Sequence, residues 1–406
     1  MVKIRRKKSR SALKACLPII VLVILGLAWI SNTPLSRTLY KDLVEAASGA
    51  GTSETKDDTP FPNLKRLNQE LLSTFITNTT SVWEAELLQR LDRIRERCGE
   101  LCTINDAAAL DKYTVNEWNA SSPFLRQMEV PFDCNTLMMD EELDKSDRLI
   151  PRYPPKVLEP YYTLNGLAGI HHKMYFNQTY LDTNASNPLW TEEYVEGWMR
   201  KVKPAFTKEG HAFIGYGPDA TNFVKLIEKY VPVKDKRVLV IGTENPWVEA
   251  AALILGASHV VTLEYGKIVS QHPRVSTLTP PEIRELYRSK ELEKFDVVLS
   301  FSSLEHPGLG RYGDALNPWG DLLATAKAWC ITKPGGYLGL GLPFGEDFVY
   351  FNAHRKYGPN RMSLMGANWI QLEGQSMQRN ALGRLHNGFF FRKPEDAKLF
   401  GVGAKE

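Results

Sequence analysis

Short apolar runs alternate with amphipathic stretches from residue 236 onward. Runs such as Arg237–Ile241 and Phe295–Ser300 are rich in Val, Leu and Ile and predict strands buried on both faces. Predicted helices separate them, which indicates an α/β fold with a doubly wound, mostly parallel sheet and helices on both faces. The predicted strands are Arg237–Ile241, Val260–Leu263, Phe295–Ser300 and Tyr337–Leu342, with a closing pair at Trp369–Leu372 and Phe389–Arg392; the predicted helices are Thr221–Tyr230, Pro246–Leu255, Pro280–Ser289 and Leu316–Ile331, and Lys333–Gly336 is a predicted turn.

The turn after the first of these strands has the features of a nucleotide-binding loop. Gly242 allows a tight turn and a close approach of the backbone to a ligand. Pro246 suits the first position of a helix, where its missing N–H would have no partner anyway. Glu264 lies 22 residues after Gly242, the spacing at which such folds present a carboxylate to ribose hydroxyls. We therefore expect a nucleoside-type cofactor.

The N-terminus predicts a membrane anchor. Residues 1–14 contain seven basic residues and no acidic residue, and they are followed by the 16-residue apolar run Ala15–Ile30. A cleaved signal peptide and a buried soluble helix are alternatives, but no small-x-small cleavage site follows and a buried helix leaves the basic flank unexplained. An uncleaved anchor at 15–31 fits best, with the basic tail 1–14 in the cytoplasm. The expected protein is a single-pass type II membrane protein of the Golgi or endoplasmic reticulum.

The remaining regions follow from composition. Residues 32–63 are expected to form a flexible stem, because 46–63 are small, polar and nonperiodic. Residues 64–101 have a helical pattern, which could form a coiled coil between stems or pack on the main domain. We expect a helical and irregular luminal region at 64–229, the main domain at 230–395 and a C-terminal tail at 396–406.

Sequons and cysteines are compatible with a luminal location. Glycosylation sequons lie at Asn78, Asn119, Asn177 and Asn184. Beyond the predicted anchor the cysteines are Cys98, Cys102, Cys134 and Cys330, which allow three complete pairings. The sequence does not choose among them, and Cys330 could instead be a buried helix thiol. No metal cluster, serine triad or nucleic-acid-binding patch is predicted.

Four segments in order resemble the class I S-adenosylmethionine-dependent methyltransferases over about 230–395. They are Val238–Gly242, Glu264, the strand and loop Phe295–His306, and Thr332–Tyr337. Two longer stretches, Glu305–Asp314 and Phe351–Gly358, resemble an uncharacterised family of methyltransferase-like proteins, one of the numbered domains of unknown function. The resemblance implies a Rossmann-like fold and S-adenosylmethionine as cofactor.

The resemblance also implies site residues. Val240 occupies the position of an acid in the first motif, and Glu244 could replace that acid. Histidines are the candidate bases because they titrate near neutral pH. Arginines in the loops could bind an anionic acceptor. The candidates are Gly242, Thr243, Glu244, Glu264, Tyr265, Ser300 and Ser302 for the cofactor, His306 and His354 for catalysis, and Arg311, Tyr312, Asp314 and Arg355 for the acceptor.

Three functions compete at this point. The first is methyl transfer to a hydroxyl or carboxyl acceptor, for example on a glycan or another small molecule. The second is a non-catalytic methyltransferase-like protein that binds a partner, which the altered first motif favours. The third is a type II membrane glycosyltransferase, although Asp140–Asp144 is only a weak acidic cluster for a metal-bound nucleotide sugar.

Overall fold

The structure is a computed structural model that describes residues 82–113, 126–139, 150–172, 175–176, 184–207, 210–212, 214–372 and 386–395. The predicted anchor, stem and tail, the sequons at Asn78, Asn119 and Asn177, and the cluster Asp140–Asp144 lie outside these ranges. Asn184 opens strand β2 (Asn184–Trp190). Within the described ranges, no helix has the length and apolar character needed to cross a membrane.

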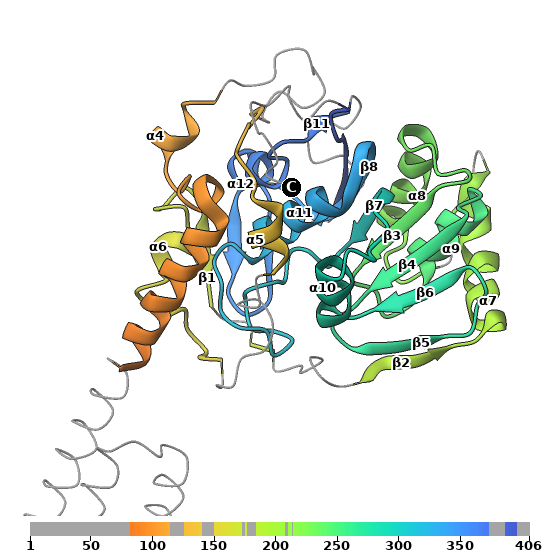
Figure 1. The fold of residues 1–406 in the computed structure, drawn as a ribbon, viewed down its shortest axis with the longest axis horizontal. Helices are drawn as coiled ribbons and strands as arrows, with labels where there is room; N and C mark the ends of the chain where they lie inside the picture. The colour runs from red at the N-terminus through yellow and green to blue at the C-terminus, as the bar shows by residue number, and fades with distance from the viewer. Residues whose placement is uncertain are drawn as a thin grey trace, which may run out of the picture. The chain divides into compact units, whose positions relative to one another are not determined.

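Helices and strands alternate through the second half of the chain, as the sequence predicted (Figure 1). A first helix covers 82–98. The other helices are η1 (Gly99–Cys102), α4 (Ala107–Leu110), α5 (Cys134–Met138), α6 (Glu159–Tyr162), α7 (Glu192–Val202), η2 (Lys203–Phe206), α8 (Pro218–Tyr230), α9 (Trp247–Ile254), α10 (Pro280–Arg288), α11 (Gly320–Ile331) and α12 (Pro359–Met365). The strands are β1 (Gly169–His171), β2, β3 (Arg237–Ile241), β4 (His259–Leu263), β5 (Lys267–Ser270), β6 (Val275–Leu278), β7 (Phe295–Phe301), β8 (Thr332–Pro343), β9 (Phe348–Tyr350), β10 (His354–Lys356), β11 (Ile370–Gln371) and β12 (His386–Arg392).

The main sheet has seven strands in the order β11-β12-β8-β7-β3-β4-β6. Strands β6, β4, β3, β7 and β8 are parallel, whereas β12 is antiparallel to both β8 and β11. Numbered along the chain, the parallel strands have the spatial order 3-2-1-4-5 of a doubly wound Rossmann-like sheet. The order reverses between β3 and β7, and ligands of such sheets bind outside the carboxyl ends of the strands at that point.

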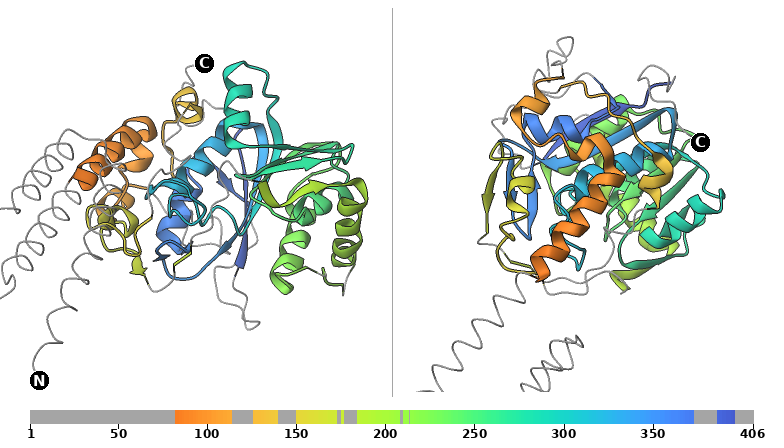
Figure 2. Two further views of the ribbon diagram at one scale, coloured as in Figure 1. Left: turned by 90° about the horizontal axis from the view of Figure 1, so that it is seen from below. Right: turned by 60° about the vertical axis from the view of Figure 1, so that its left-hand side comes forward.

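Both faces of the sheet are buried, which explains the continuous apolar runs. Successive strand residues point to opposite faces, so Leu239 belongs to one hydrophobic core while Val238 and Val240 belong to the other. Figure 1 shows α7, α8 and α9 on one side of the sheet and α5, α11 and α12 on the other. The helix at 82–98 lies outside α11 and α12 and contributes Leu91 and Ile94 to their core (Figure 2).

The ends of some helices and strands differ from the prediction near proline and glycine residues. Helix α11 starts at Gly320 rather than Leu316, because the residue before Pro318 is disfavoured in the helical region. Pro246 caps α9 instead of being its first residue. The predicted turn Lys333–Gly336 lies within β8 as an irregularity, since Thr332 pairs with Phe295 but Tyr337 pairs with Val297. The closing pair is confirmed as β11 and β12.

Two disulfides resolve the open cysteine pairing. Cys98 is bonded to Cys102 at the end of the first helix. Cys134 of α5 is bonded to Cys330 of α11 over a sequence separation of 196. The alternative of a buried free thiol at Cys330 is therefore wrong. The second bond fixes α5, which precedes the sheet in the chain, to a helix that covers the sheet.

A buried acid in α9 should make stability depend on pH. Glu249 is fully buried, and burial raises the pKa of its carboxyl from 4.5 to about 8, although Thr262 Oγ1 donates to Oε1 over 2.7 Å. The folded state therefore holds a proton that the unfolded state loses above pH 4.5, so stability falls as pH rises towards 8. The shift at Glu249 should lower the free energy of unfolding of the wild type by about 3 kcal/mol between pH 5 and 8. We expect Glu249→Gln to lack this part of the decrease.

Urea unfolding at a series of pH values measures this effect. Burial raises the pKa values of Glu264 and Glu305 to about 7, so both also make the free energy of unfolding fall as the pH rises. Their contribution remains in the Glu249→Gln variant. Equal pH dependence in the wild type and Glu249→Gln would contradict the assignment.

Candidate functional site

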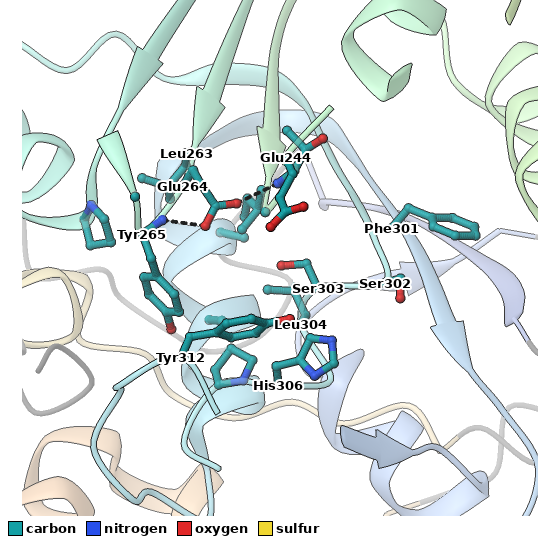
Figure 3. A pocket seen from close by; sticks show the side chains of 18 of the residues that line it. Glu244, Leu263, Glu264, Tyr265, Phe301, Ser302, Ser303, Leu304, His306 and Tyr312 are labelled. Carbon is teal, nitrogen blue, oxygen red and sulfur yellow. Dashed lines mark hydrogen bonds between the residues drawn. The ribbon is translucent and has the colours of Figure 1, made fainter. Parts of the chain in front are cut away.

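A cavity of about 510 Å³ lies where the strand order reverses. Its walls come from the residues that follow β3, β4 and β7, together with a loop before α8. Figure 3 shows Glu264 and Tyr265 on one side, Ser302 and Phe301 on the other, and Ser303 and His306 between them. The lining includes Tyr216, Gly242, Thr243, Glu244, Glu264, Tyr265, Ser302, Ser303, His306, Arg311 and Tyr312.

The turn after β3 requires glycine. Gly242 has φ +73°, and a Cβ at this position would lie 1.6 Å from Ser303 Oγ. Its N–H donates to Leu263 O over 2.9 Å, which ties the turn to the end of β4. The close approach of the loop after β7 therefore accounts for this glycine, and the cavity opens beside the same contact.

Glu264 is held rigidly at the carboxyl end of β4. Its Oε2 accepts from the Thr243 N–H over 2.8 Å, and its Oε1 accepts from the Tyr265 N–H over 2.7 Å. Burial raises the pKa of the carboxyl to about 7. Each carboxylate oxygen can accept a second hydrogen bond. The Gly266 N–H is a third backbone donor to this carboxylate, and the acceptor capacity that remains suits the predicted contact with ribose hydroxyls.

Glu244 and Tyr265 also line the cavity, as predicted for cofactor-binding residues. Glu244 is exposed, so its carboxylate can meet a ligand at low desolvation cost. Val240, which replaces the usual acid, is fully buried in the sheet. Thr243 Oγ1 donates to Asn245 O over 2.6 Å, so this hydroxyl shapes the turn.

His306 lines the cavity, but its environment weakens it as a base. Its Nδ1 lies 2.6 Å from Ala353 O, which can only accept, so Nδ1 carries the hydrogen. Burial, reinforced by Arg311, lowers the pKa of the imidazole to about 3. A group with that pKa holds a proton poorly at neutral pH. The structure therefore favours His306 as a neutral wall of the cavity.

Four other predicted site residues do not line the cavity. His354 stacks on Tyr350 with ring centroids 4.8 Å apart and is not among the lining residues. Ser300 Oγ donates to Ile241 O over 3.0 Å inside the sheet. Asp314 is fully buried and accepts from the N–H groups of Gly308, Gly310 and Tyr312.

Arg355 is the fourth predicted site residue that does not line the cavity. It is fully buried and donates to backbone oxygens, the shortest being Pro307 O at 2.6 Å. Asp314 and Arg355 therefore shape the loop after β7, and their predicted role in binding the acceptor is replaced by a structural one. Of the acceptor candidates, Arg311 and Tyr312 do line the cavity.

The sequence did not single out a polar cluster at the Ser302 side of the cavity. Ser302 has φ +51°, and its Oγ donates to Glu305 Oε1 over 2.8 Å and lies 3.1 Å from His386 Nε2. Glu305 is 1% exposed, and its Oε2 has no hydrogen-bond partner within the described part of the chain. The Glu305-His306 pair was a signal for the carboxylate. Nothing in the sequence pointed to His386, which lies 84 residues beyond Ser302.

No group of three or more His, Cys, Asp or Glu side chains within the described ranges is arranged to hold a metal ion.

Part of the chain is similar to a known protein family. Residues 235–387 match the profile of a family described as Caenorhabditis protein of unknown function, DUF268. No curated protein matches the chain.

Similar solved structures include the 1,6-didemethyltoxoflavin-N1-methyltransferase of Burkholderia thailandensis with bound S-adenosylhomocysteine (15% identity, 44% of this chain and 79% of that chain, TM-score 0.33). A second is a putative hemolysin from Lactococcus lactis (13% identity, 44% of this chain and 88% of that chain, TM-score 0.30). A third is a putative RNA methyltransferase from Pyrococcus horikoshii (15% identity, 50% of this chain and 96% of that chain, TM-score 0.28). Likeness at these levels is too distant to assign an activity. Residues 235–387 are therefore similar to the DUF268 family, one of the numbered domains of unknown function to which the sequence pointed.

Proposed function

We propose that the protein transfers a methyl group from S-adenosylmethionine to a hydroxyl or carboxyl acceptor, with a glycan as the favoured class. The observation that carries the proposal is the position of Glu264. It directly follows β4 beside the glycine turn at Gly242 and lines a cavity of about 510 Å³ at the strand-order reversal. That volume is within the usual range for small-molecule and cofactor sites.

The residues present fit the cofactor. Glu264 would accept the ribose hydroxyls, and the glycine turn lets the backbone come close to the ligand. Pro280 and Ile283 give the same end an apolar wall suited to a base ring. When bound, S-adenosylmethionine supplies an electrophilic methyl group on a sulfonium sulfur. Glu244 would lie near the cationic part of the ligand and favour it electrostatically.

We also propose a luminal location for the domain, as a type II membrane protein of the secretory pathway. The basic tail and apolar run at the N-terminus support the topology. Two disulfides within the described ranges support an oxidising compartment.

Calorimetric titration of S-adenosylhomocysteine into the full-length chain tests the cofactor site. We expect binding that weakens by at least about 100-fold in Glu264→Ala, because two hydrogen bonds to a charged acceptor are lost. Glu249→Gln is the matched control, since it changes another buried acid that does not line the cavity. It should bind as the wild type does.

A folded wild-type chain that binds no S-adenosylhomocysteine would contradict the proposal. It would favour a non-catalytic binding protein, which the buried Val240 and the internal hydrogen bonds of Glu264 also allow. A glycosyltransferase would instead show a raised melting temperature with a nucleotide sugar and manganese.

A further inference from the structure

A chain of polar side chains leads from the cavity wall into the protein. Ser302 lines the cavity, and its Oγ lies 3.1 Å from His386 Nε2. On the other side of the imidazole, His386 Nδ1 lies 3.5 Å from Asp219 Oδ2. Ser302 follows β7, His386 opens β12 and Asp219 is in the first turn of α8. Three elements distant in sequence thus place a hydroxyl, an imidazole and a carboxylate in line.

The imidazole ring is fixed on several sides. It stacks on Phe301 with centroids 5.1 Å apart and planes 25° apart, and the Tyr216 ring meets it edge-on at 5.6 Å. The backbone N–H of His386 donates to Asp219 Oδ2 over 3.0 Å, which holds that carboxylate beside the ring. His386 Nδ1 is buried and makes no hydrogen bond within the described residues, and Asp219 Oδ2 is the carboxylate oxygen that lies 3.5 Å from it. With its hydrogen on Nδ1, towards this carboxylate, the ring would turn the lone pair of Nε2 to Ser302.

The surrounding charges suit proton uptake at this histidine. Burial lowers the pKa of His386, so the ring is neutral before reaction. Once protonated, it would lie 3.5 Å from Asp219 Oδ2, whose charge opposes the effect of burial, and 3.9 Å from Oε1 of Glu305, whose pKa burial raises to about 7. Opposite charges at these distances stabilise the imidazolium. His306, by contrast, has Arg311 as an unfavourable neighbour.

We propose that Ser302 and His386 form the acceptor end of the site and that the acceptor is a hydroxyl. The acceptor O–H donates to Ser302 Oγ. As the acceptor oxygen bonds the methyl carbon, the sulfonium sulfur keeps the electron pair of the broken C–S bond. In this step the Ser302 hydroxyl turns its hydrogen from Glu305 Oε1 to His386 Nε2. The acceptor proton then passes to Ser302 Oγ, and the Ser302 proton passes to His386 Nε2, where Asp219 stabilises it. This inference rests on the proposed function.

The same geometry argues against a carboxyl acceptor. A carboxylate has no proton to lose and would not need the relay. The relay therefore narrows the acceptor to neutral hydroxyls, such as those of sugars.

Labelling with phenylmethanesulfonyl fluoride tests the relay in the full-length chain, without acceptor or cofactor. A serine oxygen whose proton passes to a histidine attacks the sulfonyl sulfur, so that an O–S bond replaces the S–F bond, fluoride leaves and the proton stays on the histidine. Mass spectrometry of peptides locates the sulfonylated residue. We expect label at Ser302, none in Ser302→Ala, a rate about 100-fold lower in His386→Gln, and a smaller decrease in Asp219→Asn. Circular dichroism checks that each variant is folded. If His386→Gln does not fold, the labelling rate of Asp219→Asn tests the relay in its place.

A second serine–histidine pair is the matched control. His259 Nε2 lies 2.8 Å from Ser276 Oγ, but neither residue lines the cavity. Ser276 should stay unlabelled, and His259→Gln should leave the rate at Ser302 unchanged.

Three results would overturn the inference. They are an unlabelled Ser302 in folded protein, an unchanged rate in His386→Gln, and a rate lost in Glu305→Gln but kept in His386→Gln, which would make Glu305 the base. Titration of S-adenosylhomocysteine on the same samples separates the two proposals. If Ser302 is labelled but S-adenosylhomocysteine does not bind, the result would support the proton relay and contradict the proposed methyl transfer.

Discussion

Replacement of both Cys134 and Cys330 by alanine is expected to lower the free energy of unfolding by about 5 kcal/mol. The bond closes a loop with a sequence separation of 196, so its removal releases a large chain entropy in the unfolded state. It also joins two helices that share one core, since Cys134 and Cys330 both pack in it. Guanidinium unfolding of the wild type and the double variant, followed by circular dichroism, measures the difference.

The other disulfide is the control for loop length. Cys98 and Cys102 are only four residues apart, so the same entropy relation gives about 2 kcal/mol for the double alanine variant. Equal losses for the two pairs would show that loop closure is not the source of the stabilisation.

Asp321→Asn is expected to cost about 3 to 5 kcal/mol of stability. Asp321 is fully buried and accepts from Arg361 Nε and Nη2 over 2.7 and 2.6 Å, while Arg355 Nε lies 3.6 Å away. Burial alone would raise the pKa of this carboxyl, yet the two guanidinium groups hold it below its usual value. The amide keeps the shape but removes the carboxylate that faces both guanidinium groups, leaving two buried cations.

The exposed pair of Glu285 and Arg288 provides the comparison for this variant. The two side chains lie 2.6 Å apart in α10, but solvent screens them, so Glu285→Gln should leave the urea midpoint unchanged. A change below about 1 kcal/mol for Asp321→Asn would mean that water or rearrangement compensates the buried arginines.

The sequence predicted the sheet well because its signal is local. An apolar run such as Phe295–Ser300 has to be buried on both faces, and a glycine such as Gly242 marks a turn, whatever the rest of the chain does. The predicted strands at Arg237–Ile241 and Val260–Leu263 agree with β3 and β4 within one residue. Gly242 and Glu264 reached the cavity because both follow such strands directly.

Predictions that depended on distant contacts were weaker. Asp314 and Arg355 lie in loops near the cavity, but their partners are backbone groups that only the folded chain brings within reach. His386 joins Ser302 because β12 inserts beside β8, and no local pattern reveals that pairing. Nor does spacing choose among cysteine pairings, since the partner of Cys134 is set by the packing of α5 on α11.

The long disulfide also bears on how the protein is made. Cys134 leaves the ribosome 196 residues before Cys330, a delay of about 10 to 40 s at ordinary elongation rates. During that interval its thiol coexists with those of Cys98 and Cys102. Beyond the apolar run that contains Cys16, three nascent cysteines are then present, and only one pairing among these three is native. In an oxidising compartment, correct maturation then depends on delayed oxidation or on an isomerase that reopens premature bonds.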